Sequence, residues 1–312
     1  MSEFASNAST GTAPSPAVSR SDFDAPFGKY ALPAWREAIR RFASHMPVNK
    51  LGNLLSSGCR RLSLFAHASG LNGPFDVAVA DGVRARLYPA SNRCEKRAFA
   101  GVQHWDGDEI AELVRAVDAV AAGNKQSSFV FLDVGSNVGL YSLFVSAAVR
   151  RHAVPASLIA IEPDLENRSR LMFNAAASGA ELIVEAVAIA EKQGTGQLSA
   201  NEKNRGGVHL VEKVEIGGQS VPLETLAHLA NRHGLSHINA MKVDIEGKDL
   251  AALTHFFQTA PETLFPELLI LETGRDGDSP LIDLATSHGY SVVARPTINT
   301  ILTRQGVLGD TA

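Results

Sequence analysis

The chain of 312 residues lacks several features that would place it outside the ordinary globular classes. It has only two cysteines, Cys59 and Cys94, which excludes a disulfide framework and a Cys-x-x-Cys zinc site and favours a reducing compartment. It has no apolar run of about 18 residues, so no membrane-spanning helix is predicted. Its first residues lack a basic start followed by an apolar core, so no secretory signal is predicted either. These absences together favour a cytoplasmic protein.

An excess of positive charge is also lacking. The 29 Lys and Arg residues are outnumbered by 33 Asp and Glu residues, and the formal net charge is −4. Domains that bind nucleic acid usually carry a basic excess, so no nucleic-acid partner is expected. Hydrophobic residues make up 45% of the chain, which is enough for the core of one large domain with an extension.

Composition and patterning divide the chain into four parts. Residues 1–28, which begin with a stretch rich in Ser, Ala, Thr and Pro, are expected to form a disordered tail, and residues 307–312 a second tail. Residues 29–125 are expected to form an extension of helices and one β-hairpin, which turns at Asp81-Gly82. Residues 126–306 alternate between strand and helix patterns and are expected to form the main domain.

The main domain has the pattern of an α/β fold. Strands are expected at residues 129–134, 157–162, 182–187, 238–243, 267–272, 290–295 and 298–303, and helices at 138–150, 165–178, 222–232, 247–258 and 278–288. The last two strands are joined by too short a link to be parallel neighbours, so they should form an antiparallel pair. The order predicts a doubly wound, mostly parallel sheet that ends in an antiparallel hairpin.

The beginning of the extension is unusually basic. Residues 29–67 contain seven Lys or Arg residues and a single acid. Trp35 and Phe42 recur at helical spacing on the face opposite Arg36 and Arg40. We favour a helical extension that packs on the main domain with its basic face in solvent. A basic amphipathic cap that contacts the inner face of a membrane, or an acidic partner, is the alternative.

A candidate nucleotide site lies in the stretch "LDVGSNVG". Asp133 ends the first strand of the main domain, and Gly135 and Gly139 allow the backbone to pass close to a ligand, where open α/β sheets bind ligands. The spacing lacks the Gly-x-Gly of dinucleotide-binding proteins, which disfavours a dehydrogenase. It suits a nucleoside with a cationic or zwitterionic tail, whose ammonium group Asp133 could anchor. Glu162 ends the second strand, where an acid can accept the ribose hydroxyls.

Four segments resemble, in this order, the FkbM family of S-adenosylmethionine-dependent methyltransferases: "FLDVGSNVGLYSL", "IAIEPD", "NAMKVDIEGKDLAAL" and "LLILE". The segment "VPLETL" also matches the helix start that the family has before its fourth strand, whereas Ser136 stands where the family more often has alanine. The resemblance covers residues 129–304 and implies a Rossmann-like class I methyltransferase sheet with S-adenosyl-L-methionine as cofactor. The cofactor-binding residues that it implies, together with the patterns above, are Asp133, Gly135, Ser136, Asn137, Gly139, Glu162, Ala186 and Val187.

The candidate catalytic residues follow the fourth strand. "MKVDIEG" places Lys242, Asp244 and Glu246 at alternate positions, so they leave the strand on one side. Asp244 or Glu246 could remove the proton of an acceptor hydroxyl, with Lys242 tuning their charge or orienting the hydroxyl. A purely structural ion pair is an alternative. A divalent metal on these two carboxylates and Glu272 is less favoured, because the lysine opposes it and no further ligand cluster completes a cage.

An insertion at residues 196–218 is expected to form a short hairpin over the cofactor. Its tip would carry Asn204, Arg205 and His209 towards the acceptor, with His209 as a second candidate base, unless the segment is only a polar loop.

The function expected from the sequence is S-adenosylmethionine-dependent O-methylation. The acceptor would be a hydroxyl of a sugar, a glycolipid or polysaccharide, or a natural product. Peripheral contact of residues 29–67 with the inner membrane face belongs to the alternative interpretation of that segment. An N- or protein methyltransferase, or a non-catalytic binding module, are the alternatives, because a fold does not define its acceptor.

Overall fold

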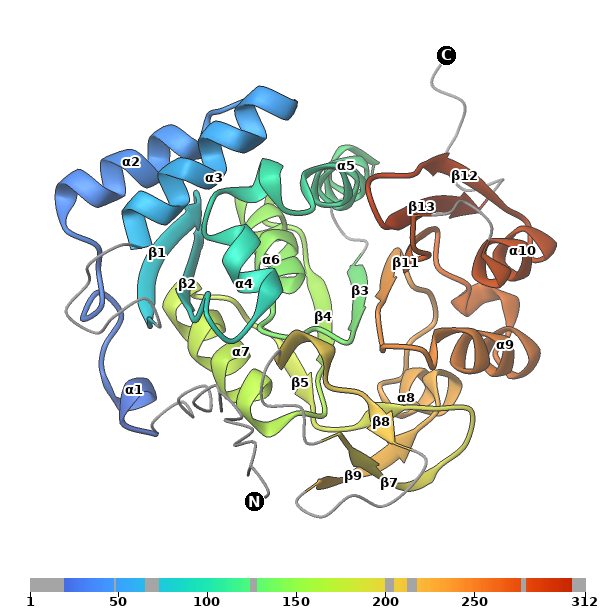
Figure 1. Ribbon diagram of the computed structural model, residues 1–312. Coiled ribbons are helices and arrows are strands. Elements are labelled where there is room, and N and C mark those ends of the chain that lie inside the picture. The colour runs from blue at the N-terminus through green and yellow to red at the C-terminus, as the bar shows by residue number, and fades with distance from the viewer. Residues whose placement is uncertain are drawn as a thin grey trace, which may run out of the picture.

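The computed structural model describes residues 20–47, 49–64, 73–123, 128–199, 205–211, 218–275 and 279–304. A seven-stranded sheet forms its centre (Figure 1). Its strands are β3 (Phe129–Val134), β4 (Ala156–Ile161), β5 (Ile183–Glu185), β10 (Ala240–Val243), β11 (Leu268–Glu272), β12 (Tyr290–Ala294) and β13 (Asn299–Arg304). They lie in the order β12-β13-β11-β10-β3-β4-β5, and only β13 runs antiparallel to its two neighbours. The predicted doubly wound sheet with an antiparallel C-terminal hairpin is confirmed.

Helices cover both faces of this sheet. One face carries α5 (Gly107–Gly123), α6 (Leu140–His152) and α7 (Leu165–Ser178), and the other carries α8 (Leu226–Arg232), α9 (Asp249–Thr259) and α10 (Pro280–Ser287). Side chains of β3 alternate between the two layers: Phe129 and Phe131 join the first core, and Val130 and Leu132 join the second. A strand buried on both faces reads as a continuous apolar run, which is why β3 was visible in the sequence.

A second, four-stranded sheet forms the insertion. It contains β6 (Ala188–Ile189), β7 (Gly194–Leu198), β8 (Leu210–Val211) and β9 (Gln219–Glu224), in the order β6-β9-β7-β8. The antiparallel pair of β7 and β8 is the predicted hairpin. Residues 200–204, which include Asn204 of the predicted tip, lie outside the described residues.

The helix predicted at 222–232 is wrong at its start. Residues up to Glu224 belong to β9, which pairs with β7, and α8 begins only after Thr225. The Thr225 side chain accepts a hydrogen bond from the His228 backbone N–H, so it is the N-cap of α8. The alternating residues before it satisfy their backbone groups in the sheet instead.

The chain before the main domain contains α1 (Arg20–Asp24), α2 (Ala34–Ser44), α3 (Lys50–Leu64), β1 (Phe75–Ala80), β2 (Val83–Leu87), α4 (Arg93–Ala98) and the short 3-10 helix η2 (Val102–His104). Two further 3-10 helices, η3 (Arg205–Gly207) and η4 (Glu262–Leu264), lie in the main domain. The predicted hairpin of β1 and β2 is confirmed, and Gly82 takes the positive φ of 72° that its turn requires.

A buried ion pair fastens the start of the chain to this hairpin. Arg86 Nε lies 2.7 Å from Asp76 Oδ1, and both side chains are fully buried. Arg86 also donates to the carbonyl oxygens of Ala25 and Pro26 at 2.9 Å each. The prediction of a disordered tail over residues 1–28 is therefore wrong from Arg20 onward, because the backbone there satisfies a buried guanidinium.

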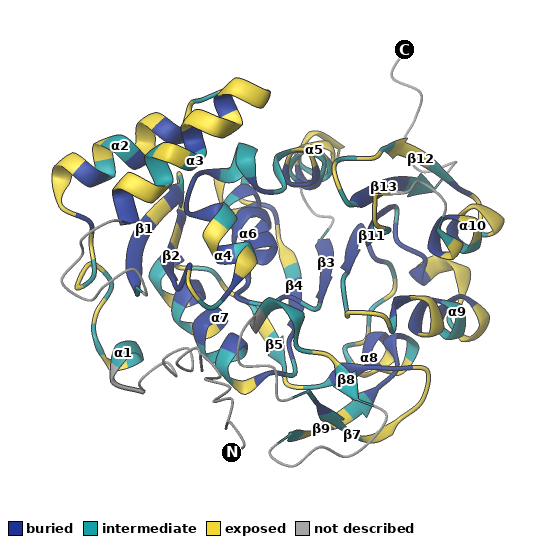
Figure 2. Cartoon of the chain, in the orientation of Figure 1, coloured by how far each residue is buried: buried dark blue, intermediate teal, exposed yellow. Residues whose placement is uncertain are grey.

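The orientation that we favoured for the basic helices is also wrong. Arg36 and Arg40 are only 7% and 3% exposed, whereas Trp35 and Phe42 face solvent. Arg40 makes two hydrogen bonds of 2.7 Å to Glu37 and one of 2.9 Å to the Ala78 carbonyl of β1. The guanidinium groups therefore face the protein, and the apolar side chains face outward. Figure 2 shows buried and exposed positions side by side along α2. None of the helices described is long and apolar enough to cross a membrane.

The Asp76–Arg86 pair gives a test of the fold. Asp76→Asn leaves the Arg86 charge buried without its carboxylate, so we expect the free energy of unfolding to fall by about 3–5 kcal/mol. Asp81→Asn, at the exposed hairpin turn, should change it by no more than about 0.5 kcal/mol. Urea unfolding of both variants measures the difference, and equal effects would show that the pair does not hold this region together.

Candidate active site

Two cavities meet at the carboxyl ends of the central strands. The β4-side cavity lies between the loops after β3, β4 and β10 and the hairpin of β7 and β8. The β11-side cavity extends from the loops after β3 and β10 to α4 and to the end of β11. Both are lined by Gly135, Asn137, Gly206, Asp244 and Glu246. Ligands in the two cavities would therefore meet at this shared boundary.

The first glycine of the loop after β3 lies where no side chain would fit. Gly135 has a φ of 76°, and a Cβ there would lie 1.8 Å from the Asp244 carbonyl oxygen. The loops of β3 and β10 thus touch through their backbones. Gly139 has a different role, because its Cβ would meet the Leu171 side chain at 2.8 Å and it lines neither cavity. It permits close packing of α6 against α7.

Asp133 is fully buried beneath this loop. Its Oδ2 accepts hydrogen bonds from the Ser142 backbone N–H (3.1 Å) and hydroxyl (2.6 Å), which satisfies a free donor in the first turn of α6. Its Oδ1 has no hydrogen-bond partner among the described residues, and the same is true of the buried Ser136 Oγ. Asp133 lines neither cavity, whereas Ser136 lines the β11-side cavity. Unsatisfied buried oxygens at a loop are what a polar ligand would complete.

Glu162 lies at the predicted place, on the wall of the β4-side cavity. Its two carboxylate oxygens accept hydrogen bonds from the backbone N–H groups of Asn137 (2.7 Å) and Asp164 (2.9 Å). Burial raises the pKa of Glu162 to about 8. Each oxygen keeps one lone pair free for a ligand, so the group can accept two hydroxyl hydrogens.

The rest of the β4-side cavity is an apolar slot. Val187 lines it as predicted, but Ala186 is exposed and does not. Ala188 and Ile189 of β6 line it instead, opposite Leu198 and Leu210 of the hairpin. An apolar slot beside a carboxylate suits the flat base of a nucleoside. The sequence signal was present in the apolar run "VAIA", which continues past the predicted strand.

Buried Lys242 pairs with Asp244, which is partly exposed and lines both cavities. Lys242 Nζ lies 2.8 Å from Asp244 Oδ2 and 5.1 Å from the centre of the Tyr141 ring. Burial alone would lower the pKa of Lys242, but the charges of Asp244 and Asp133 outweigh it and raise the pKa above its ordinary value. Burial likewise tends to raise the pKa of Asp244, yet Lys242 and a hydrogen bond from Glu272 hold it below its usual range.

Glu272 at the end of β11 completes this group. Burial and then the Asp244 charge raise the pKa of Glu272 to about 8. The two carboxyl groups therefore hold one proton between them at neutral pH, and that proton lies on Glu272. Among the described residues, no group of three or more His, Cys, Asp or Glu side chains is arranged to hold a metal ion.

Backbone strain is concentrated at this boundary. In the described part of the chain four residues other than glycine have a positive φ: Asn137, Ala153, Glu246 and Thr297. All but Ala153, a helix C-cap, line the cavities. Strain of this kind is retained where a loop has to place a functional group. Burial and then the Asp244 charge raise the pKa of Glu246, which lines both cavities.

The extension supplies a wall of the β11-side cavity that the sequence did not reveal. Trp105 and Tyr141 pack edge to face with their ring centroids 5.1 Å apart. Asp106 accepts a hydrogen bond from the Tyr141 hydroxyl at 2.9 Å and lies 3.4 Å from Arg97. The charged residues that line this cavity are Arg93, Arg97, Lys242 and Arg275, and Asp106, Asp244, Glu246 and Glu272. Cations and carboxyl groups are thus equal in number.

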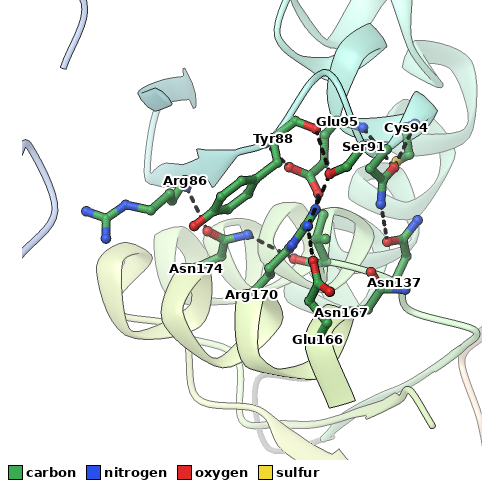
Figure 3. A network of polar contacts seen from close by, with 12 residues as sticks. Arg86, Tyr88, Ser91, Cys94, Glu95, Asn137, Glu166, Asn167, Arg170 and Asn174 are labelled. Carbon is green, nitrogen blue, oxygen red and sulfur yellow. Dashed lines mark hydrogen bonds and ion pairs between the residues drawn. The ribbon is translucent and has the colours of Figure 1, made fainter. Parts of the chain in front are cut away.

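A second buried network attaches this wall to the loop after β3 (Figure 3). Arg170 of α7 donates to Glu95 of α4 at 2.5 Å, and also pairs with Glu166. Asn92 is the N-cap of α4 and donates through Nδ2 to Asn137 Oδ1 at 2.8 Å. Arg170 therefore holds α4 in place, and α4 positions Asn137, whose backbone N–H donates to Glu162.

His209 lies in a different place from the one predicted. It is an exposed residue that lines the β4-side cavity, not the β11-side cavity. Its Nδ1 lies 3.1 Å from the Gly207 carbonyl oxygen, which requires a proton on Nδ1. The Arg205 side chain is outside the described part of the structure.

The seven-stranded sheet, in which β13 runs antiparallel between its neighbours, has the topology of a Rossmann-like class I methyltransferase. The β4-side cavity lies at the ends of β3 and β4. A model of the methyltransferase FkbM domain matches residues 133–277. The chain is an S-adenosylmethionine-dependent methyltransferase that carries an FkbM domain, as the sequence patterns indicated, and S-adenosyl-L-methionine is its cofactor. No curated protein matches the chain.

Solved structures similar to the chain are distant. Magnesium protoporphyrin IX methyltransferase from Synechocystis, with bound SAM, is 11% identical over 86% of this chain and 97% of that chain, with a TM-score of 0.40. A SAM-dependent methyltransferase from Agrobacterium tumefaciens is 13% identical over 73% and 67%, also with 0.40. Precorrin-6y C5,15-methyltransferase from Geobacter metallireducens is 11% identical over 62% and 84%, with 0.36. The class of the protein therefore rests on its own sheet and on the family match.

We expect Glu162→Gln to weaken cofactor binding by about 10- to 100-fold, because one of the two carboxyl oxygens becomes an NH2 group, which faces a backbone N–H and cannot accept a ribose hydroxyl. Glu181→Gln, at an exposed glutamate that lines neither cavity, is the control and should bind as the unmodified protein does. Calorimetry with S-adenosylhomocysteine measures both affinities. Equal affinities would show that Glu162 does not hold the ribose.

We expect Asn92→Ser to separate the two roles of Asn92. Serine keeps the N-cap of α4 but cannot reach Asn137, so the free energy of unfolding should change by less than about 1 kcal/mol. Cofactor affinity should still fall about fivefold, because the loop loses a hydrogen bond that orders it. Asn231→Ser, on the exposed side of α8, is the matched control. An unchanged affinity in Asn92→Ser would mean that the extension does not position the loop.

Proposed function

We propose that the protein methylates a hydroxyl oxygen of a sugar, a glycolipid or polysaccharide, or a natural product. The observation that carries this proposal is a group of three carboxyl side chains: Asp244 and Glu246 lie at the boundary of the two cavities, and Glu272 lies beside them on the wall of the β11-side cavity. A hydroxyl is a poor nucleophile whose proton has to be removed as the new bond forms. S-Adenosylmethionine supplies an already activated methyl group, so the protein mainly aligns the acceptor and removes this proton.

The cofactor would occupy the β4-side cavity. Glu162 would accept the ribose hydroxyls, and Val187, Ala188 and Ile189 would contact the base. Ser136 lines the β11-side cavity, so its unsatisfied oxygen would receive a hydrogen bond from the amino-acid part where that part crosses the boundary of the two cavities. Asp133 would act on the ammonium group at longer range or through water. This assignment rests on burial, on the apolar slot and on the free lone pairs of these groups.

The three carboxyl groups differ in their fitness as a base. Asp244 is held ionised by Lys242 and is a weak base, because a lowered pKa reduces the driving force for proton transfer. Glu246 and Glu272 have raised pKa values, and the value of Glu272, about 8, is close to that of an effective base near neutral pH. We therefore assign proton removal to Glu246 or Glu272, with Asp244 and Lys242 orienting the hydroxyl.

The β11-side cavity supports a polyhydroxylated acceptor. Its equal numbers of cations and carboxyl groups offer both donors and acceptors of hydrogen bonds and do not favour a cationic amine. Trp105 and Tyr141 give the wall an apolar surface that suits a sugar ring.

The acceptor can be identified by mass spectrometry of glycans, lipids and small metabolites from cells with and without the protein. The proposal predicts a compound that lacks one methyl group on oxygen in the cells without the protein. Methylation found only on nitrogen, in a metabolite or in protein, would overturn it.

The raised pKa of Glu272 gives a prediction for the pH dependence. Below about 8 this group is protonated and cannot accept a proton, so kcat/KM should rise about tenfold per pH unit and level off above about 8. Glu272→Gln should lower the rate and remove this rise. Glu262→Gln, at an exposed glutamate away from the cavities, should keep the profile of the unmodified enzyme. If Glu272→Gln keeps the rise, the assigned base is Glu246.

A further inference from the structure

We infer that the outward face of α2 and α3 docks on an anionic lipid membrane. This outward face is defined by large apolar side chains that are between 47% and 69% exposed: Trp35, Phe42, Leu51, Leu54, Leu55 and Leu62. They gather on two adjacent helices, at the outer edge of the molecule in Figure 2. Single exposed leucines need no explanation, but a contiguous set marks an interaction site.

Small residues occupy the inner side of α3, so its exposed leucines are not core residues that the helix has turned outward. Gly52, Ser56 and Ser63 point inward and are buried, and a Cβ on Gly52 would lie 1.9 Å from the Pro47 carbonyl oxygen. The helix packs closely through its small residues and leaves its leucines outside. An exposed leucine forgoes the stabilisation that burial brings, so the face calls for a partner that covers it.

The charges around this face identify the partner. Arg41, Lys50 and Arg61 are exposed on the same two helices. The one acid in residues 34–47 and 49–64, Glu37, is half-buried and holds Arg40 and Arg41. The face therefore presents apolar side chains and cations without an exposed carboxylate. Apolar side chains can insert at the acyl boundary while the cations meet anionic headgroups, as in other interfacial helices.

A second copy of the chain fits this face less well. A symmetric dimer brings the same patch of both subunits together, so Arg41, Lys50 and Arg61 would meet the same cations of the partner. A membrane has no such repulsion. The inference does not depend on the proposed acceptor, because the face could hold the enzyme at a membrane whether the acceptor is a lipid or a soluble molecule.

Co-sedimentation of the full chain with vesicles tests the inference. The chain should bind vesicles of phosphatidylcholine with phosphatidylglycerol, and at least about tenfold more weakly those of phosphatidylcholine alone. Leu54→Ser with Leu55→Ser, and separately Arg41→Gln with Lys50→Gln and Arg61→Gln, should each weaken binding at least about tenfold. Met172→Ser with Val293→Ser, which removes exposed apolar side chains elsewhere, is the matched control and should bind normally.

All of these variants change exposed side chains, so their thermal unfolding and their affinity for S-adenosylhomocysteine should stay unchanged. These readouts separate a failure of membrane docking from a failure of the enzyme. Two results would overturn the inference. One is a chain that stays in the supernatant with anionic vesicles, and the other is a dimer in sedimentation velocity that Leu54→Ser with Leu55→Ser dissociates.

Discussion

The parallel pairing of β10 with β3 is the constraint on which the site depends. Its register sets Lys242 beside Asp133, so an ammonium group lies between the carboxylates of two strands. It also brings the loop at Gly135 against the backbone of Asp244, where only glycine fits. The cofactor loop and the carboxyl group at the end of β10 are therefore two sides of one backbone contact. A shift of either strand would disturb both cavities.

The extension is part of this site and not an appendage. Burying Arg170 with Glu95 removes two charges from water, and such pairs are better explained by the geometry they impose than by net stabilisation. Here the pair holds α4 on α7, and α4 brings Asn92 to the loop and Arg97 to the β11-side cavity. One apolar core contains residues of the hairpin, of α5 and of the main sheet, so the parts fold together.

Sequence patterns predicted the features that depend on neighbouring residues along the chain, such as strands and the acids at their ends. The apolar runs of β3, β4 and β10 and the acids at their ends predicted the sheet and predicted that Glu162 and Asp244 lie at strand ends, where both line a cavity. Patterns could not show Trp105 or Arg97, because these residues reach the cavity only through tertiary packing. They also misplaced Arg36 and Arg40, and for Arg40 the reason is visible: its guanidinium donates to Glu37 and to the Ala78 carbonyl, which makes it more stable inside than its amphipathic pattern implies. Burial thus followed available hydrogen-bond partners and not hydrophobic periodicity.

The central claim is that one boundary, formed by the loops after β3 and β10, separates the methyl donor from the acceptor. A crystal structure of the chain with S-adenosylhomocysteine tests it most directly. The account predicts ribose hydroxyls on Glu162, the base between Ile189 and Leu198, and the sulfur facing Glu246 and the β11-side cavity. A cofactor whose sulfur points away from Asp244, Glu246 and Glu272 would contradict it.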